Sequence, residues 1–195
     1  GRTVPKIDAL DKVLGRAVFS EDMHFPGMLH GRVLRAGIPH ALIERIDTSA
    51  ARAMDGVACV LTAKDIPGKN LFGIAFQDQE ALVRDKIRTI GDPVALVAAE
   101  TEDIAREAVK AVRVTYKELP VLSNPFEALA EGAPRVHEKG NVALHSKTRK
   151  GDVEEGFRQA HVIVENTYRT HVQDHAYIET ESGVGKLDER GNLVI

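Results

Sequence analysis

The fold is decided by one stretch of the sequence, Ile87-Arg-Thr-Ile-Gly-Asp-Pro-Val-Ala-Leu-Val-Ala-Ala-Glu-Thr-Glu-Asp-Ile-Ala-Arg-Glu-Ala-Val-Lys-Ala-Val-Arg-Val-Thr-Tyr-Lys-Glu-Leu-Pro120. Residues 94–99 form a continuous apolar run, which is typical of a strand buried on both faces of a sheet. Thr101 is a suitable N-cap for a helix, and apolar residues recur after it at helical spacing. Residues 112–118 predict a second strand. The stretch therefore predicts a strand-helix-strand unit.

An earlier part of the chain predicts a second unit of the same kind. Residues 28–35 alternate between apolar and polar side chains, as in a half-buried strand. Asp47, Thr48 or Ser49 can cap a helix that Gly56 ends, and residues 57–62 return as a strand. Both units have a crossover of about a dozen residues, which favours a mixed or parallel sheet with helices packed against it. The predicted fold class is α+β, or mixed α/β.

The chain changes character after about residue 123, where prolines, glycines and asparagines become frequent. This composition predicts a linker, interrupted by a short helix over residues 125–131 that starts at Pro125. Beyond it, residues 152–160 predict a helix, whereas residues 161–170, 178–187 and 193–195 predict strands. We expect one domain over residues 1–130, a linker over 131–150 and an incomplete second α+β domain over 151–195. Because the pattern stops within a strand, we expect the sequence to be a fragment.

Composition excludes several classes of partner. The chain has 195 residues, 28% of them charged, and a formal net charge of −3, so nothing predicts binding to nucleic acid or to an acidic membrane surface. No apolar run approaches the roughly 18 residues of a membrane span, and the first residues lack a signal peptide's apolar segment. Cys59 is the only cysteine, which is compatible with a reducing compartment. We therefore expect a cytoplasmic protein.

Motifs that could carry chemistry on their own are weak. None of the eight histidines has recognised zinc spacing, and we expect no metal ligands among them. Gly91-Asp and Gly151-Asp lack the spacing of phosphate-binding loops and are interpreted as turns. Cys59 lies in an apolar run, which favours a packed thiol over a nucleophile. A single cysteine also cannot ligate an iron-sulfur cluster, which needs four ligands.

Several blocks of sequence, spread along nearly the whole chain, occur in the same order as similar blocks in a known protein family. They are residues 12–17, 26–29, 46–50, 60–68, 87–120, 136–142, 151–153 and 174–179. Together they resemble the large subunit of the molybdenum hydroxylases, the family of xanthine dehydrogenase, aldehyde oxidoreductase and 4-hydroxybenzoyl-CoA reductase. The resemblance implies that the first domain is an α/β hammerhead, and that the second begins the domain that carries the molybdenum cofactor, molybdopterin.

The resemblance also implies an activity. In this family a molybdenum-bound hydroxide attacks an electron-poor carbon of an N-heterocycle or aldehyde, hydride passes to a sulfido ligand, and electrons leave through iron-sulfur clusters and often FAD. The family's conserved Gln, its Gly-Gly-Phe-Gly loop and its catalytic Glu lie beyond residue 195. We therefore expect no catalytic, cofactor-binding or metal-binding residue here, and no activity from the fragment alone. The expected partners are the rest of the large polypeptide, iron-sulfur and possibly FAD subunits, and a small-molecule substrate.

One loop of the fragment approaches the substrate in this family. Alignment back from Asp85 places Ala75, Phe76 and Gln77 on that loop, so they are the predicted lining of the substrate funnel, although Phe76 could instead fill core space. We also expect His175 and Glu179 to order the second domain near the cofactor pocket.

Two other interpretations remain open. The chain could be a non-catalytic assembly or binding module of the same fold, or an unrelated α/β binding domain. Unpaired strands at the end of the second domain also predict association between copies of the chain, giving a homo-oligomer.

Overall fold

The computed structural model describes residues 1–74, 76–178 and 181–195. Its contacts divide the chain into two units: Gly27–Lys147 forms one, and Gly1–Pro26 with Thr148–Ile195 forms the other. Every buried hydrophobic side chain among the described residues belongs to the first unit. None of the helices formed by the described residues is long and apolar enough to cross a membrane.

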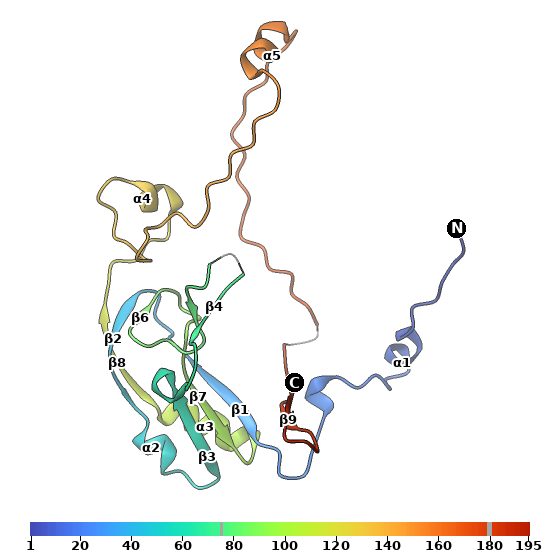
Figure 1. Cartoon of the computed structure of the whole chain (residues 1–195), viewed down its shortest axis with the longest axis vertical. Helices are drawn as coiled ribbons and strands as arrows, with labels where there is room; N and C mark the ends of the chain where they lie inside the picture. Colours follow the sequence, from blue (N-terminus) through green and yellow to red (C-terminus); the bar gives the residue numbers. More distant parts are fainter. Residues whose placement is uncertain (75, 179–180) are drawn as a thin grey trace. The chain divides into compact units, whose positions relative to one another are not determined.

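A three-stranded antiparallel sheet in the first unit is built around the apolar run (Figure 1). Strand β7 (Pro93–Ala99) lies between β1 (His30–Arg35) and β3 (Val57–Thr62) and pairs antiparallel with both. The prediction that this run is largely buried is confirmed by its inaccessible side chains, which are Val94, Ala95, Val97 and Ala99. Strand β3 has the bounds that the sequence predicted.

A second antiparallel sheet contains the strand that follows the helix predicted after Thr101. Its order is β6 (Lys86–Ile87), β2 (Ala41–Asp47) and β8 (Arg113–Glu118). The pairing of β2 with β8 shifts register between Ile43 and Arg45, which marks an irregularity in the ladder. Residues 41–47 were not predicted as a strand.

Two helices accompany the sheets. Helix α3 (Glu102–Ala111) packs against β1 and β7, and α2 (Ser49–Arg52) packs against α3 and β3. The predicted cap of α3 is confirmed, because Thr101 Oγ1 accepts a hydrogen bond from the backbone N–H of Ile104 at 3.2 Å. In front of α2, Asp47 Oδ1 accepts from the backbone N–H of Ser49 at 3.1 Å.

The two sheets enclose one core with two centres. One centre joins α2, α3, β3 and β7, and its buried residues are Ala51, Val60, Ala95, Val97, Ala108 and Val112. The other lies near β6, and its buried residues are Ala36, Ala41, Val83, Ile87 and Val94. Leu34, Ile46 and Val114 contact both centres, so the apolar contacts are continuous.

The predicted mixed or parallel pairing is wrong. Every strand pair among the described residues is antiparallel. Strands β1 and β3 share a sheet, but β7 lies between them, and β7 and β8 belong to different sheets. The crossover rule assumes that the strands flanking a helix are neighbours in one sheet, and here the chain changes sheet instead.

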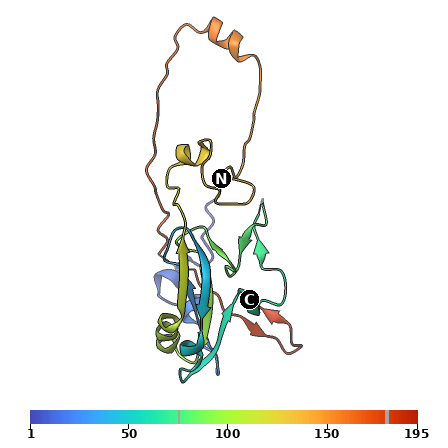
Figure 2. The same ribbon diagram turned by 90° about the vertical axis from the view of Figure 1, so that its left-hand side faces the viewer.

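A short hairpin projects from the larger sheets, as Figure 2 shows in green. It consists of β4 (Leu71–Phe72) and β5 (Gln79–Glu80), with Leu71 opposite Glu80 and Phe72 opposite Gln79. Beyond β8, helix α4 (Pro125–Leu129) starts at Pro125 as predicted. Asn124 caps it, because its Oδ1 accepts from the backbone N–H of Phe126 at 2.9 Å.

The second unit has little regular structure among its described residues. It contains α1 (Ala9–Val13), α5 (Val153–Gln159) and a hairpin of β9 (Lys186–Leu187) with β10 (Leu193–Val194). The predicted helix over residues 152–160 is confirmed by α5. The strand predicted over residues 161–170 is wrong, since none of these residues is in a strand. Alternating apolar and polar residues give a strand one apolar face, but a strand also needs a neighbouring strand to which it is hydrogen-bonded.

Candidate functional site

The loop at the tip of the β4–β5 hairpin carries two of the predicted site residues. Phe76 is 47% exposed and Gln77 is exposed, whereas Ala75 lies outside the described residues. Gly73 begins the loop with φ of +145°, and a Cβ added there would overlap the backbone oxygen of Phe76. The backbone can therefore fold back on itself at this point only because residue 73 has no side chain.

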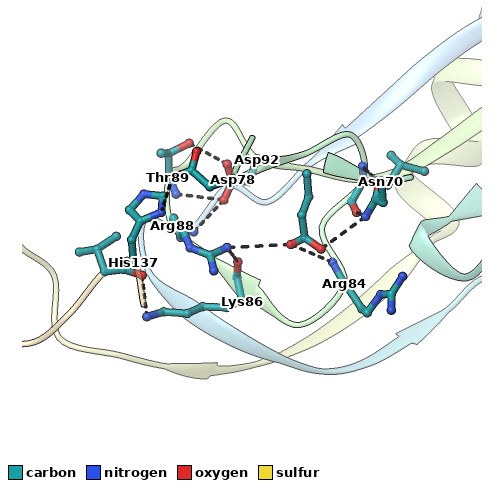
Figure 3. A network of polar contacts seen from close by, with 11 residues as sticks. Asn70, Asp78, Arg84, Lys86, Arg88, Thr89, Asp92 and His137 are labelled. Atoms are coloured by element: carbon teal, nitrogen blue, oxygen red, sulfur yellow. Dashed lines mark hydrogen bonds and ion pairs between the residues drawn. The ribbon is translucent and has the colours of Figure 1, made fainter. Parts of the chain in front are cut away.

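Charged side chains surround the described part of the loop. Lys69 Nζ donates a hydrogen bond to Gln77 Oε1, and Lys139 Nζ lies 5.8 Å from the centre of the Phe76 ring. His137 Nδ1 lies 3.7 Å from a carboxylate oxygen of Asp78 (Figure 3), an ion pair when the imidazole is protonated. The segment that contains His137 and Lys139 therefore contacts the hairpin loop.

Asn70 holds the base of the hairpin (Figure 3). Its side chain is buried, its Nδ2 donates to the carbonyl of Leu82 at 2.7 Å, and its Oδ1 accepts from the N–H of Leu82 at 3.1 Å. The backbone carbonyl of Asn70 also accepts from the N–H of Ala81 at 2.9 Å. These bonds satisfy buried polar groups on both sides of the hairpin just below its two paired residues.

A half-buried ion pair lies beside this asparagine. Glu80 Oε2 lies 3.9 Å from Arg88 Nη1, and the two side chains are only 18% and 22% exposed. Glu80 also approaches Asn70, whose Nδ2 lies 3.4 Å from its Oε1. Arg88 Nη1 donates to the carbonyl of Lys86 at 3.2 Å, while Arg88 Nε has no hydrogen-bond partner among the described residues. The pair links β5 to the end of β6 (Figure 3).

Lys86 fastens the segment after α4 to the second sheet. Its Nζ donates to the carbonyls of Arg135 and Val136 at 2.9 and 2.8 Å. Burial lowers the pKa of Lys86, and the nearby charge of Arg88 lowers it further. On the other side of Arg88, Asp92 Oδ2 accepts from the N–H of Arg88 at 2.7 Å and closes the turn before β7.

This arrangement is suited to positioning. The tip presents an aromatic ring and an amide, and the polar network below it keeps the base in place. No group of three or more His, Cys, Asp or Glu side chains in the described ranges is placed to hold a metal ion. Among the described residues, His175 stacks on Tyr177 with ring centres 5.6 Å apart; Glu179, which was also expected to order the second domain near the cofactor pocket, lies outside them.

The sequence predicted the loop but missed its support. Nothing in the spacing of Asn70, Glu80, Lys86 and Arg88 matches a known motif, because their contacts depend on the register of a hairpin with two residues in each strand. Gly73 was a signal for the loop only, since an isolated glycine inside a strand pattern suggests a bulge or a close backbone approach.

Two family models match this chain. The first is described as "Aldehyde oxidase and xanthine dehydrogenase, a/b hammerhead domain" and matches residues 14–120, more than half of the sequence. The chain belongs to the aldehyde oxidase and xanthine dehydrogenase family. The second is described as "Molybdopterin cofactor-binding domain" and matches residues 136–195. The predicted resemblance to the molybdenum hydroxylases and the hammerhead fold is confirmed.

Curated relatives of the family cover almost all of this chain but are much longer. The chain is 45% identical over 188 residues to a probable xanthine dehydrogenase subunit of Bacillus subtilis, covering 96% of the chain and 25% of the relative. It is 43% identical over 195 residues to the nicotinate dehydrogenase large molybdopterin subunit of Eubacterium barkeri, covering 100% of the chain and 46% of the relative. The chain thus spans a quarter to under half of these two relatives.

Solved structures in the family agree with the fold. The aldehyde oxidoreductase from Desulfovibrio gigas is 36% identical with a TM-score of 0.65, over 69% of this chain and 16% of that one. The aldehyde oxidoreductase from Desulfovibrio desulfuricans is 36% identical with a TM-score of 0.68, over 72% and 17%. The hairpin lies inside the first matched region, whereas His137 and Lys139, which contact its loop, lie inside the second.

Proposed function

We propose that this chain is part of a molybdenum hydroxylase large subunit that hydroxylates an N-heterocycle or an aldehyde. The observation that carries the proposal is the match of two consecutive regions, in order, to the hammerhead and cofactor-binding families. Relatives named as xanthine and nicotinate dehydrogenase subunits support the heterocycle, and structures named as aldehyde oxidoreductases support the aldehyde.

The loop of Ala75, Phe76 and Gln77 is proposed to line the substrate funnel. Phe76 is an aromatic side chain that is only half covered, at the tip of a hairpin whose base is tied down by buried polar contacts. Binding residues are often carried on loops held by a rigid scaffold, and an aromatic wall suits a flat heterocycle or an aryl aldehyde. The proposed role of this loop is to orient the substrate.

The molybdenum cofactor is proposed to bind mainly to residues outside this chain. A site for it would need several converging polar groups, and the described residues of the second matched region are largely exposed, with no cluster of ligating side chains. We therefore expect the rest of the cofactor-binding domain to supply most of the cofactor's contacts. The cofactor supplies the redox chemistry when bound, while iron-sulfur clusters and FAD belong to other domains or subunits.

The partners follow from the same proposal. Exposed apolar side chains on and after α5, among them Phe157 at 54%, Ile163 at 59% and Val162 at 71%, suit burial against the rest of the large polypeptide. We also propose a cytoplasmic location, in keeping with the single cysteine, and the domain limits 1–130, 131–150 and 151–195. We further propose that the chain forms a homo-oligomer.

The substrate loop is tested by Phe76→Ala in the complete enzyme. Without the ring the funnel loses one wall, so KM for an aromatic substrate should rise and kcat/KM should fall roughly tenfold, which is about 1.4 kcal/mol. The molybdenum content should not change. Phe126→Ala is the matched control, because Phe126 is 79% exposed on α4 and should leave the kinetics unaltered.

Unchanged kinetics in Phe76→Ala would contradict a funnel role for the loop. The assignment to a larger enzyme has its own test. The purified 195-residue chain should contain no molybdenum on elemental analysis and should oxidise neither an aldehyde nor a purine.

A further inference from the structure

We infer that Asn70 is a positioning residue of this enzyme, which sets where the Phe76 loop lies against the substrate. The inference rests on the proposed function of that loop. It concerns a side chain that is not on the loop, whose amide acts through the hairpin backbone.

The hairpin cannot define its own position. Strands β4 and β5 contribute two residue pairs, and a ladder of this length is not stable on its own. Its strands are also exposed at Leu71, Phe72 and Gln79, so apolar burial contributes little to their order. The direction in which the tip points must therefore be set below the ladder.

Asn70 occupies that point and behaves like an additional pair of the ladder. It directly precedes β4, and its side chain makes both a donor and an acceptor bond to the backbone of Leu82, at 2.7 and 3.1 Å. Its own backbone carbonyl accepts from Ala81 at 2.9 Å. With the residue 8% exposed, water does not compete well for these groups, so the amide locks the spacing between the two ends of the hairpin.

The ion pair of Glu80 and Arg88 then fixes the hairpin against the second sheet. Glu80 is the last residue of β5 and lies opposite Leu71, and its carboxylate is shared between Asn70 Nδ2 and Arg88 Nη1. Arg88 directly follows β6, whose last residue, Ile87, is fully buried. A path of contacts therefore runs from the core through Arg88 and Glu80 to Asn70 (Figure 3).

The test compares Asn70→Ala and Asn70→Asp with Asn124→Ala in the complete enzyme. Asn70→Asp keeps an oxygen for the N–H of Leu82 but loses the amide donors and places a second carboxylate beside Glu80. Asn124→Ala removes a helix cap of α4 and so controls for a general loss of stability. Hydrogen exchange is followed in peptides covering residues 71–80, and steady-state kinetics are measured with an aromatic substrate.

Both Asn70 variants should exchange the amides of residues 71–80 about tenfold faster, while those of β7 stay protected. KM should rise roughly fivefold with kcat within about twofold of the parent, because a displaced wall weakens binding and leaves the molybdenum chemistry intact. A purely structural role would instead lower the active fraction, and hence kcat, at constant KM. Asn124→Ala should change neither the exchange rates of residues 71–80 nor KM.

Two outcomes separate the inference from the function on which it rests. If exchange over residues 71–80 is unaltered in both Asn70 variants, Asn70 does not position the loop and the inference fails. If exchange accelerates but neither these variants nor Phe76→Ala affects KM, the loop moves without touching the substrate, and the proposed function fails instead.

Discussion

Gly73 shows how one residue can determine the path of the loop between β4 and β5. Its φ of +145° belongs to a region that residues with a side chain rarely adopt, and the space where a Cβ would lie is filled by the backbone oxygen of Phe76. A side chain at this position cannot be relieved by a rotamer change, because the obstacle is backbone.

We predict that Gly73→Ala displaces the loop and costs about 1–3 kcal/mol of local stability. Substrate KM should rise in the complete enzyme, and the 71–80 peptides should lose protection in hydrogen exchange. Gly68→Ala is the control, since an added Cβ there meets nothing within 4 Å and the backbone is not left-handed. Equal behaviour of the two variants would show that the turn tolerates a side chain.

At the scale of an element, the end of β3 depends on a carboxylate. Asp65 Oδ2 accepts from the N–H of Thr62 at 2.7 Å and from its Oγ1 at 2.9 Å, which caps the single turn η2 (Ala63–Asp65). These bonds lower the pKa of Asp65 below its usual 3.8, because they favour the ionised form.

A depressed carboxylate pKa stabilises the folded chain above the unfolded-state pKa, and this contribution is lost as the pH falls through the folded-state value. We predict that Asp65→Asn lowers the free energy of unfolding above pH 3.8, and that its difference from the parent shrinks below that pH. Urea denaturation at a series of pH values measures this. Asp55→Asn, which changes a carboxylate in the turn before β3, is the matched control.

Local signals in the sequence were sufficient for some elements and not for others. The cap at Thr101, the helix α3 and the strand β7 follow from propensity and periodicity, which act within a few residues. Strand partners do not follow from these local signals, because the pairing of β7 with both β1 and β3 depends on contacts between distant segments. The proposed site residue Phe76 came from the family resemblance, whereas the contacts of Asn70 were not predicted because they exist only once Leu82 lies beside it.

At the scale of the whole chain, the two units differ in how many hydrophobic side chains they bury. All buried hydrophobic side chains among the described residues lie between Ala36 and Val112, whereas the large hydrophobic side chains of α5, Val153 and Phe157, are exposed. We predict that limited proteolysis cuts residues 1–26 and 148–178 first and leaves a resistant core close to 27–147. Mass spectrometry of the digest identifies the core. Early cleavage within β7 or α3 would contradict the division into units.

The central position of β7 has a consequence for synthesis. Translation delivers β1 and β3 to the ribosome exit well before residues 93–99, the strand that must insert between them. Until it arrives, both strands have unpaired edges and can be bound by chaperones or by neighbouring nascent chains. The yield of folded protein therefore depends on how quickly this short segment follows its partners, so synonymous codons ahead of residue 93 offer a handle on yield that changes no amino acid.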